Sequence, residues 1–525
     1  MENANPKIAL INVTKIDYGY LEPPLGLLSI ASYLIREKVV REKDIKILDV
    51  NFKNPLAFLK YFKPNIVGLS AMTASYPDAI TLGRKIKNKF ETLVVIGGIH
   101  ISVDPQNITY PFDIGVIGEG EETFLKLVKL IKKNKYNYFH KLRRIKGIVY
   151  LNENNKPHIT PRRLQIKRLD KLPMLNWSLL PKIYFRNEIV RINNKWCVLK
   201  EAPLFSSRGC PFNCVFCARK SLFKGVRYFS IKRIVDEIEI LVKKHKVEAI
   251  HFWDDIFSVS KKRTKDLIKE MEKRNLLRDV VFNKLFARAD LIDEEFLSLL
   301  KKLEVVNLSY GFESGSDKII AFLKNDTVTV ADNRKAILLT DKFNIGITGS
   351  FMFGSPHETK KDMEKTLDLI KWAIKKENFI RLDICKTTPY PGTKIWQYAL
   401  DNKIISKNMN LKKLKLNVPS LDSSKPIFVE SEKIKDFKKI WSEVKKLYRD
   451  VNKKNDKQGY HKAWIIADQK KETSIKFLPF ELIWNELRVG RFYIGINLIF
   501  TKTKSLFKII FKKILNKISL SNGNH

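Results

Sequence analysis

The stretch Arg208-Gly-Cys-Pro-Phe-Asn-Cys-Val-Phe-Cys-Ala218 decides the interpretation of this chain. It places Cys210, Cys214 and Cys217 in one short loop with C-x3-C-x2-C spacing. A cubane iron–sulfur cluster has four irons and usually takes four thiolates. A loop that offers three thiolates leaves one iron without a protein ligand, and that iron can bind another molecule. The spacing therefore predicts a 4Fe-4S cluster that takes part in chemistry.

Zinc binding and a disulfide are the alternatives for these cysteines. Zinc usually takes four ligands, often as two pairs, and no second pair of cysteines lies near the loop. Few cysteines, gathered in a metal-binding pattern, are typical of a reducing cytoplasm rather than of a disulfide framework. Cys197 and Cys385 stand alone, and buried small side chains are the default expectation for both.

The residues around and after the cysteine loop alternate strand-like and helix-like patterns. Helical patterns such as Ile231–Lys244 and Thr264–Lys273 separate apolar runs that read as strands. Six such units predict a partial (βα)6 TIM-like barrel, whose working residues lie at the C-terminal ends of the strands. The expected strands are Leu204–Arg208, Ala249–Asp254, Phe282–Ala287, Val305–Gly311, Gly346–Phe353 and Ile380–Thr387.

The first 150 residues show a second alternation of strands and helices, which predicts a Rossmann-like parallel sheet covered by helices. Ligands of such sheets bind at the carboxyl ends of the strands, and polar residues and glycines gather there in this chain. The expected strands are Lys7–Val13, Ile45–Val50, Ile66–Ser70 and Leu93–Gly98, with a helix at Pro24–Leu34. The candidate binding residues are Ser70, Thr73, Gly97, Gly98, His100, Gly118, Glu119 and Gly120.

Taken together and in order, these features resemble the cobalamin-binding radical S-adenosylmethionine (SAM) enzymes. That family includes hopanoid methylases, archaeal tetraether-lipid ring synthases and the anaerobic magnesium-protoporphyrin ester cyclase. The resemblance covers about residues 1–400. Its motifs are Pro24-Leu-Gly-Leu-Leu28, Ser70-x-x-Thr73, Gly97-Gly-x-His100, Gly118-Glu-Gly-Glu121, the cysteine loop and Gly311-x-Glu-Ser-Gly-Ser316.

The resemblance implies an α/β chain of four parts. They are a cobalamin-binding Rossmann-like domain (1–150), a linker (151–200), a radical SAM core (201–400) and a mainly helical, basic C-terminal region (401–525). It also implies three cofactors: a 4Fe-4S cluster, SAM and cobalamin. In this family the reduced cluster cleaves SAM to a 5′-deoxyadenosyl radical, which takes hydrogen from an unactivated carbon. A flavodoxin or ferredoxin is the expected electron donor.

The resemblance assigns SAM-binding roles to residues at the first three barrel strands. Phe216 is expected beside the adenine, although a core phenylalanine fits equally. At least one of Asp254 and Asp255 is expected to meet the SAM amino group, because buried carboxylates need a cation, while a helix N-cap is the alternative. Arg288 is suited to the SAM carboxylate, and a structural ion pair is the alternative.

Further roles fall at the fourth and sixth strands. Glu313 is expected to accept hydrogen bonds from the ribose hydroxyls, and Ser314 opens a helix that can face a polar group. A capping turn is the alternative for both. Tyr390 is the candidate catalytic residue facing the reaction chamber, and a plain turn residue is its alternative.

One departure concerns the cobalamin domain. Some cobalamin domains carry Asp-x-His-x-x-Gly, whose histidine ligates cobalt, whereas this chain reads Asp49-Val-Asn-Phe-Lys-Asn54. His100 lies elsewhere in the pattern, and a histidine that makes hydrogen bonds in a loop is its alternative role. We therefore expect the lower axial ligand of cobalt not to be a histidine of this domain.

The chain is strongly basic, with 98 Lys and Arg against 56 Asp and Glu, a formal net charge of +42. This excess predicts attraction to polyanions, either nucleic acid or an anionic membrane surface, although genomic bias toward lysine on solvated faces is an alternative. The C-terminus has no acidic residue after Glu486. Apolar residues at Phe507, Ile510, Phe511, Ile514 and Ile518 follow helical spacing and predict a basic amphipathic helix.

Such a helix favours peripheral binding to a membrane surface, with packing on the barrel or on another subunit as the alternative. The first residues do not form a signal peptide, and no run of apolar residues is long enough to span a membrane. The expected location is the cytoplasm, including the inner face of the membrane.

These expectations define the predicted function. The chain should transfer a methyl group or form a C–C bond or ring at an unactivated carbon of a small molecule, with a membrane lipid or isoprenoid favoured. RNA modification is the second hypothesis, but methylthiotransferases carry N-terminal cysteines and this chain has none before Cys197. The third hypothesis is a corrinoid or cluster sensor that binds SAM without cleaving it.

Overall fold

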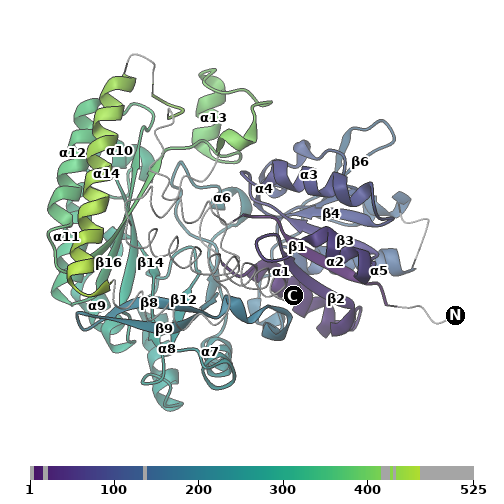
Figure 1. Cartoon of the computed structure of the whole chain (residues 1–525), viewed down its shortest axis with the longest axis horizontal. Helices are drawn as coiled ribbons and strands as arrows, with labels where there is room; N and C mark the ends of the chain where they lie inside the picture. Colours follow the sequence, from purple (N-terminus) through teal and green to yellow (C-terminus); the bar gives the residue numbers. More distant parts are fainter. Residues whose placement is uncertain (1–4, 16–21, 134–138, 415–425, 430–432, 461–525) are drawn as a thin grey trace, which may run out of the picture.

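The computed structural model describes residues 5–15, 22–133, 139–414, 426–429 and 433–460. Figure 1 shows two units beside each other: the N-terminal residues form the smaller one, and the rest of the described chain forms the larger one. The predicted amphipathic helix at residues 504–518 lies outside the described residues.

The smaller unit is a sheet with the order β2-β1-β3-β4-β5-β6-β7. The first five strands in this order are parallel, and β6 and β7 extend the edge in antiparallel pairs. The strands are apolar on both faces because helices cover both sides. The strands are β1 (Ile8–Asn12), β2 (Ile45–Asp49), β3 (Ile66–Ser70), β4 (Leu93–Gly97), β5 (Ile114–Val116), β6 (Ile148–Leu151) and β7 (Pro157–Ile159). The helices are α1 (Leu25–Arg36), α2 (Pro55–Phe62), α3 (Tyr76–Lys87), α4 (Ile99–Val103) and α5 (Gly120–Lys133).

The segment expected as a linker contributes to both units. Its first residues complete β6 and form β7 on the small sheet, and its last residues form the hairpin of β8 (Arg186–Ile192) and β9 (Lys195–Leu204) on the barrel. Asn193 and Asn194 both have positive φ, 46° and 64°, which suits a tight hairpin turn. The stretch between the sheets carries buried Trp177 and is therefore packed, not a free connector.

The larger unit is a partial barrel of six parallel strand positions. β9 pairs with β12, and β12 pairs with β13. A single parallel bridge between Phe282 of β13 and Val305 connects this group to the second one, in which β14, β15, β16 and β17 pair in that order. The third position is split into two short strands at Lys284, whose φ is 53°. The strands are β10 (Ser207–Arg208), β11 (Arg227–Tyr228), β12 (Ala249–Phe252), β13 (Val281–Phe282), β14 (Leu285–Ala287), β15 (Asn307–Glu313), β16 (Gly346–Phe353) and β17 (Phe379–Lys386).

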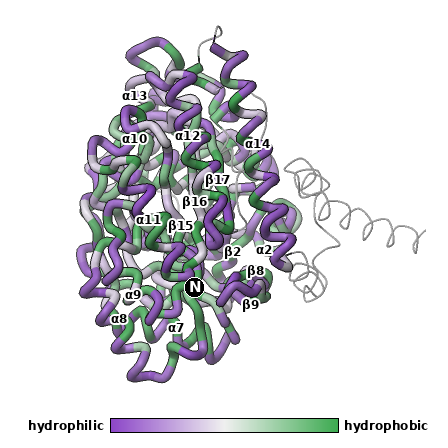
Figure 2. Tube along the Cα trace, turned by 90° about the vertical axis from the view of Figure 1, so that its left-hand side faces the viewer, coloured by the Kyte–Doolittle hydropathy of each residue, from purple (hydrophilic) through white to green (hydrophobic). Residues whose placement is uncertain are grey.

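Helices cover the outer face of this barrel. Their apolar sides pack on the strands; for example, the ring centres of Phe353 in β16 and Trp441 in α14 are 6.1 Å apart. A buried hydrogen bond of 2.7 Å between the hydroxyls of Tyr310 and Thr340 also joins β15 to α11. In Figure 2 the trace of α14 alternates between hydrophobic and hydrophilic, as expected for a helix with one buried side. The helices are α6 (Arg219–Leu222), α7 (Ile231–His245), α8 (Lys261–Lys273), α9 (Glu294–Lys302), α10 (Asp317–Lys324), α11 (Val330–Lys342), α12 (Lys360–Ala373), α13 (Lys394–Asp401) and α14 (Ile434–Lys457).

The predicted fold class is confirmed: a Rossmann-like unit precedes a partial (βα)6 barrel. The main difference concerns the first barrel strand: it spans Lys195–Leu204, whereas the sequence predicted Leu204–Arg208. Residues 207–208 instead form β10, which pairs with β11. No helix in the described part of the chain is long and apolar enough to span a membrane.

We predict that Phe353→Ala lowers the free energy of unfolding by about 3–5 kcal/mol, because this fully buried ring fills the space between β16 and α14. The measurement is urea unfolding followed by tryptophan fluorescence. Leu338→Ala on α11 is the matched control, since Leu338 is 47% exposed and should change stability by no more than about 0.5 kcal/mol. Equal effects of the two substitutions would contradict this packing.

Candidate active site

A cleft of about 1080 Å³, counting the space at its open mouth, lies between the small sheet and the start of the barrel. The small unit contributes the ends of β3 and β4, the start of α1 and the turn into α5. The barrel contributes the segment before the cysteines and the end of β12. From the barrel side the lining residues are Phe205, Ser207, Arg208, Gly209, Arg219, Phe223, Trp253 and Asp255.

Glycines and apolar side chains together line the cleft on the small unit, and we refer to this side as the glycine wall; its glycines are Gly26, Gly68, Gly97, Gly98, Gly118 and Gly120. Gly98, at φ 100°, sits against the backbone of Ala71, where a side chain would collide. At Gly26 and Gly118, by contrast, an added Cβ would meet no atom within 4 Å, so it would enter the cleft. Six of the eight predicted binding residues line this wall: Ser70, Gly97, Gly98, Gly118, Glu119 and Gly120. Glycines that open into the cleft, set among apolar side chains such as Leu10, Ile30 and Phe124, fit a large flat ligand such as a corrin ring.

Thr73 and His100 lie behind that wall. They are 5% and 0% exposed, and His100 Nδ1 is 3.4 Å from the Thr73 hydroxyl. The His100 ring packs 4.1 Å from Tyr76, and burial lowers its pKa to about 4. The structure therefore differs from the expectation that these two side chains touch the ligand, because the core has enclosed them.

Asp49, which starts the segment lacking the cobalt-ligating histidine, has a structural role. Its carboxylate accepts hydrogen bonds from Asn12 at 2.8 Å and from the Tyr184 hydroxyl at 2.6 Å. Tyr184 belongs to the stretch between the two sheets, so this carboxylate helps to join that stretch to the end of β2. The prediction about the axial ligand stays a prediction.

The cysteine loop begins directly at the cleft and is anchored at its start and in its middle. Gly209 lines the cleft and donates its N–H to Asp255 at 3.1 Å. In the middle of the loop, Val215 donates to the Leu323 carbonyl at 3.0 Å and accepts from Ile395 at 3.1 Å. The loop is therefore held between β12, α10 and α13, at the carboxyl ends of the barrel strands.

Burial of Cys210 and Cys217 disfavours their thiolate forms unless a cation compensates the charge. Burial raises the pKa of Cys210 to about 11, with further contributions from Cys217, Asp255 and Cys214, and burial also raises the pKa of Cys217. Three thiolates side by side are stable only when positive iron compensates them. Among the described residues, no three His, Cys, Asp or Glu side chains converge on a single metal ion; a cubane binds each thiolate to its own iron.

The two adjacent aspartates after β12 have different surroundings. Asp254 is 2% exposed and accepts the N–H groups of Ser206 and Ser207 at 2.7 and 3.0 Å, so it fixes the backbone ahead of the cysteines. Burial raises its pKa to about 6. Asp255 lines the cleft, where it also pairs with Arg219 at 2.8 Å. Of the two, Asp255 is the carboxylate that can reach a bound molecule.

Arg288 lies against the cysteine loop. Its guanidinium is 3.6 Å from the centre of the Phe212 ring, and it donates to Asp290 at 2.8 Å and to the Thr327 hydroxyl at 2.7 Å. Its remaining nitrogen, Nη1, is buried and has no hydrogen-bond partner. An orphaned donor beside the cluster loop fits the carboxylate of SAM, the role expected for Arg288.

Glu313 forms a buried ion pair that the sequence did not reveal. Its carboxylate accepts from Lys324 Nζ at 2.8 Å, and both side chains are 8% exposed. Lys324 Nζ also lies 5.5 Å from the centre of the Phe216 ring, so the ion pair lies beside the cysteine loop. Burial alone would lower the pKa of Lys324, but Glu313 and Cys214 raise it above its usual value. Phe216 is half-buried against an apolar cluster that includes Leu323.

Ser314 and Tyr390 make contacts within the protein. Ser314 is fully buried and shares a 3.0 Å hydrogen bond with Thr366 of α12. Its hydroxyl also accepts the N–H of Ser316 at 3.1 Å, which fits the capping-turn alternative. Tyr390 packs against the apolar cluster that includes Leu411 and the core of the small unit, and burial raises the pKa of its phenol. The structure therefore places Tyr390 between the two units, and its catalytic role stays a prediction.

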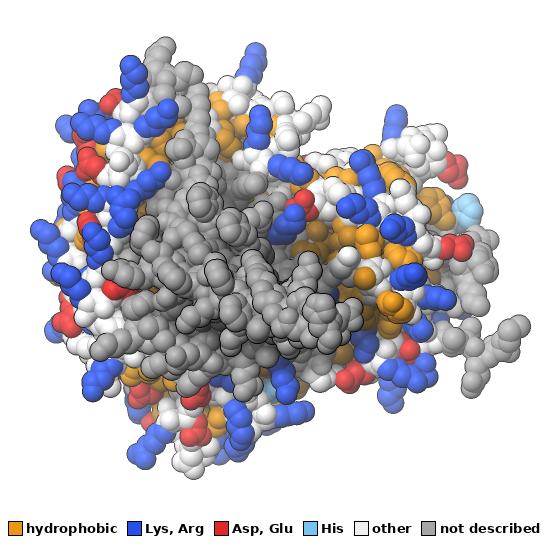
Figure 3. Space-filling model, viewed as in Figure 1, with side chains coloured by type: hydrophobic (Ala, Val, Ile, Leu, Met, Phe, Trp, Pro, Cys, Tyr) orange, Lys and Arg blue, Asp and Glu red, His pale blue; other side chains and the backbone are white. Residues whose placement is uncertain are grey.

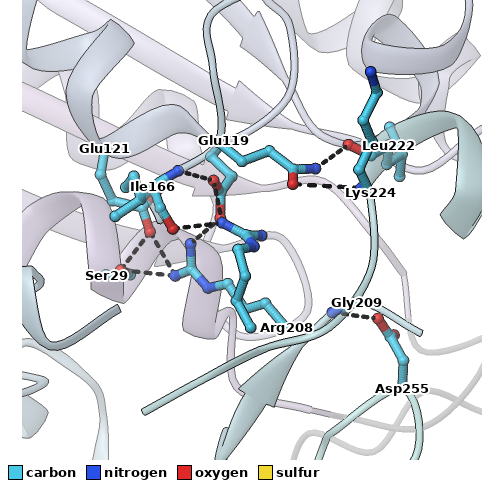
Figure 4. Close-up of polar contacts among 11 residues, drawn as sticks. Ser29, Glu119, Glu121, Ile166, Arg208, Gly209, Leu222, Lys224 and Asp255 are labelled. Atoms are coloured by element: carbon cyan, nitrogen blue, oxygen red, sulfur yellow. Dashed lines mark hydrogen bonds and ion pairs between the residues drawn. The ribbon is translucent and has the colours of Figure 1, made fainter. Parts of the chain in front are cut away.

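A cluster of four charges joins the small unit to the segment before the cysteines (Figure 4). Arg208 donates to Glu119 at 2.8 Å and to Glu121 at 2.7 Å, and Arg227 donates to Glu119 at 2.9 Å. Ser29 of α1 donates to Glu121 at 2.6 Å. Burial alone would raise the pKa of Glu121, but the charge and hydrogen bonds of Arg208 hold it below its usual value. We refer to Glu119, Glu121, Arg208 and Arg227 as the ion-pair cluster.

Sequence reasoning missed the partners of these carboxylates. Glu119 was identified as a candidate ligand of the cleft, and it does line the cleft, yet its oxygens are bound by Arg208, Arg227 and the N–H of Ile166. The only sequence signal was that Arg208 directly precedes the Gly-Cys of the loop. Glu119 and Arg208 are 89 positions apart, and the spacing of apolar residues in helices and strands carries no information about contacts over that distance.

Comparisons with known proteins agree with this geometry. Residues 204–370 match the radical SAM superfamily, and residues 11–128 match the B12 binding domain. An uncharacterized methyltransferase of Pyrococcus horikoshii is 33% identical over 399 residues, which is 74% of this chain and 80% of that protein. The anaerobic magnesium-protoporphyrin IX monomethyl ester cyclase of Rubrivivax gelatinosus is 28% identical, over 64% of this chain and 58% of that protein.

Two solved structures share the fold. The radical SAM methyltransferase TsrM of Kitasatospora setae, with cobalamin and a 4Fe-4S cluster bound, superimposes with a TM-score of 0.59 at 17% identity, covering 75% of this chain and 74% of that one. The cobalamin-dependent SAM radical enzyme OxsB, with aqua-cobalamin and SAM bound, gives 0.58 at 18% identity, covering 80% and 58%. The two domain matches identify the cofactors as a 4Fe-4S cluster, SAM and cobalamin.

We predict that Cys214→Ala abolishes assembly of the 4Fe-4S cluster, because two loop thiolates cannot hold a cubane that keeps one iron open. Iron content and visible absorbance after anaerobic reconstitution measure the effect. Cys197→Ser is the matched control: Cys197 lies outside the loop and donates to the Val190 carbonyl, which a serine hydroxyl can also do. Equal iron loading in both variants would refute the assignment of the loop.

We predict that Gly26→Leu weakens cobalamin binding by at least about tenfold, since a side chain that overfills a packed site costs about 1–3 kcal/mol. An added Cβ at Gly26 meets no atom of the described residues within 4 Å, and leucine favours a helix more than glycine does, so the melting temperature should be retained. Equilibrium dialysis with hydroxocobalamin measures the affinity. Gly26→Ala, which adds a single methyl group, is the control; unchanged affinity in the leucine variant would show that cobalamin does not occupy this cleft.

Proposed function

Because this chain belongs to the cobalamin-binding radical SAM enzymes, we propose that it transfers a methyl group to, or closes a ring at, an unactivated carbon of a membrane lipid or isoprenoid. That it is a cobalamin-dependent radical SAM enzyme of the methylating or cyclising kind follows from the two domain matches and the relatives. The carbon that reacts and the lipid substrate are the parts we propose.

The observation that carries the chemistry is that the glycine wall and the start of the cysteine loop face the same cleft. An unactivated C–H bond offers no acidic proton to a side chain, so the cofactors supply the radical and the methyl group. The chain's own residues bind and orient. Asp255 and Arg288 offer a carboxylate and an orphaned guanidinium nitrogen beside the loop, which suits the amino and carboxylate ends of SAM.

The lipid substrate is supported by charge and by the sequence of the C-terminus. Figure 3 shows Lys and Arg spread around the visible face of both units, alongside exposed hydrophobic side chains. A chain with a net charge of +42 is attracted to anionic surfaces. The basic amphipathic pattern of residues 504–518 would add apolar insertion to that attraction. We propose peripheral association with the inner face of a membrane and reduction by a flavodoxin or ferredoxin.

The test is a reaction with anaerobically reconstituted enzyme, hydroxocobalamin, SAM, a reductant and a lipid extract of cells. We expect 5′-deoxyadenosine together with a lipid that gains the mass of one methylene group, or that loses two hydrogens if a ring closes. Both products should be absent with Cys214→Ala. Mass spectrometry follows the nucleoside and the lipids in the same sample.

Three results would contradict the proposal in distinguishable ways. Deoxyadenosine with unchanged lipids would keep the chemistry and exclude the lipid substrate. A product formed on added RNA, with salt-sensitive binding, would favour RNA modification. Bound but uncleaved SAM in a protein with an intact, reducible cluster would favour a sensor.

A further inference from the structure

The ion-pair cluster connects two backbone segments that serve different cofactors. Glu119 and Glu121 flank Gly120, and all three line the cleft on the cobalamin side. Arg208 lies two residues before Cys210, and its backbone pairs with that of Arg227 where β10 and β11 run antiparallel. The same four side chains therefore connect the end of the glycine wall to the beginning of the cysteine loop.

The ion-pair cluster is shielded from solvent on every member. Glu121 is 4% exposed, Glu119 9%, Arg227 11% and Arg208 16%. Two arginines balance two glutamates, and each carboxylate takes a further hydrogen bond, from Ser29 or from Ile166. Removing one partner would leave a buried charge unpaired, which is strongly unfavourable. Nε and Nη2 of Arg227 already lack a hydrogen-bond partner among the described residues, so loss of one carboxylate would leave the two arginines still less compensated.

Each of the two connected segments contains a glycine in a left-handed backbone conformation. Gly118 and Gly209, at φ 80° and 96°, adopt backbone conformations that glycine tolerates and that cost entropy to fix. Cobalamin against the cleft wall would order residues 118–121, and a cluster on the cysteines would order residues 208–217. Because the ion-pair cluster ties these segments together, the first cofactor bound would meet part of the ordering cost of the second.

We propose that the ion-pair cluster couples the loading of the two cofactors, so that cobalamin and the 4Fe-4S cluster each bind more tightly when the other is present. Arg208, Glu119, Glu121 and Arg227 are positioning residues in this account and take no part in the chemistry. The coupling must be reciprocal: the factor by which the cluster raises cobalamin affinity equals the factor by which cobalamin stabilises the cluster. The inference is independent of the substrate.

The test measures hydroxocobalamin affinity by equilibrium dialysis with the full chain, once with the cluster reconstituted and once without iron. For the wild type we expect the cluster to tighten cobalamin binding by about 5- to 150-fold, the usual range of such coupling. In Glu121→Gln and in Arg208→Lys the ratio should fall toward one. Glu121→Gln removes the charge but keeps the shape, and Arg208→Lys keeps the charge but loses the forked pairing.

Arg191→Lys is the matched control. Arg191 is also a buried arginine, 3% exposed and paired with Glu377 at 3.3 Å, but it does not line the cleft. A general loss of stability would alter both affinities in this variant and leave their ratio unchanged. The rate at which a chelator removes iron, with and without hydroxocobalamin, gives the reciprocal measurement and should show the same dependence on Glu121.

The proposal fails if the wild type binds hydroxocobalamin equally well with and without the cluster. It also fails if the wild type shows coupling but Glu121→Gln and Arg208→Lys retain the full ratio. Should Glu121→Gln prevent folding, as judged by circular dichroism, Arg208→Lys and Glu119→Gln give the same reading independently.

Discussion

The active site depends on the burial of four paired charges between the two units. Arg208 stands at the entrance to the cysteine loop, and Glu119 and Glu121 stand at the end of the glycine wall. Charges of this kind are costly to remove from water unless they are paired. Each glutamate takes a further hydrogen bond, from Ser29 or from Ile166, whereas Nε and Nη2 of Arg227 are buried without a hydrogen-bond partner in the described part of the chain. The pairing joins the glycine wall to the segment that leads into the cysteine loop.

The two units line the cleft and the cysteine loop with different kinds of residues. The small unit places glycines among its apolar lining residues, and an added Cβ at Gly26 or Gly118 would meet no described atom within 4 Å. The barrel instead supplies polar groups held in place by their neighbours, such as Asp255, which is paired with Arg219, and Arg288, which lies on Phe212. A corrin ring needs area and SAM needs charge complementarity, so this division suits the cofactors of the family.

The periodic features were predictable from the sequence, whereas contacts between distant segments were not. Hydrophobic runs located β3 and β16 at their observed bounds, and the cysteine spacing identified the loop. The roles of single polar residues depended on partners elsewhere in the chain. Asp254 binds the backbone ahead of the loop and Ser314 binds Thr366. The pairing of Glu313 with Lys324 likewise has no periodic signal, since it requires β15 and the end of α10 to be placed first.

The most direct test of this account is the magnetic interaction between the two cofactors in the full chain. With cobalamin bound as cob(II)alamin and the cluster reduced, both are paramagnetic, and electron paramagnetic resonance reports on their separation. Two cofactors on facing walls of one cleft should give a dipolar-broadened cob(II)alamin signal, with one narrow distribution of distances. A cob(II)alamin signal that is unchanged when the cluster is reduced would show that the two do not share this cleft.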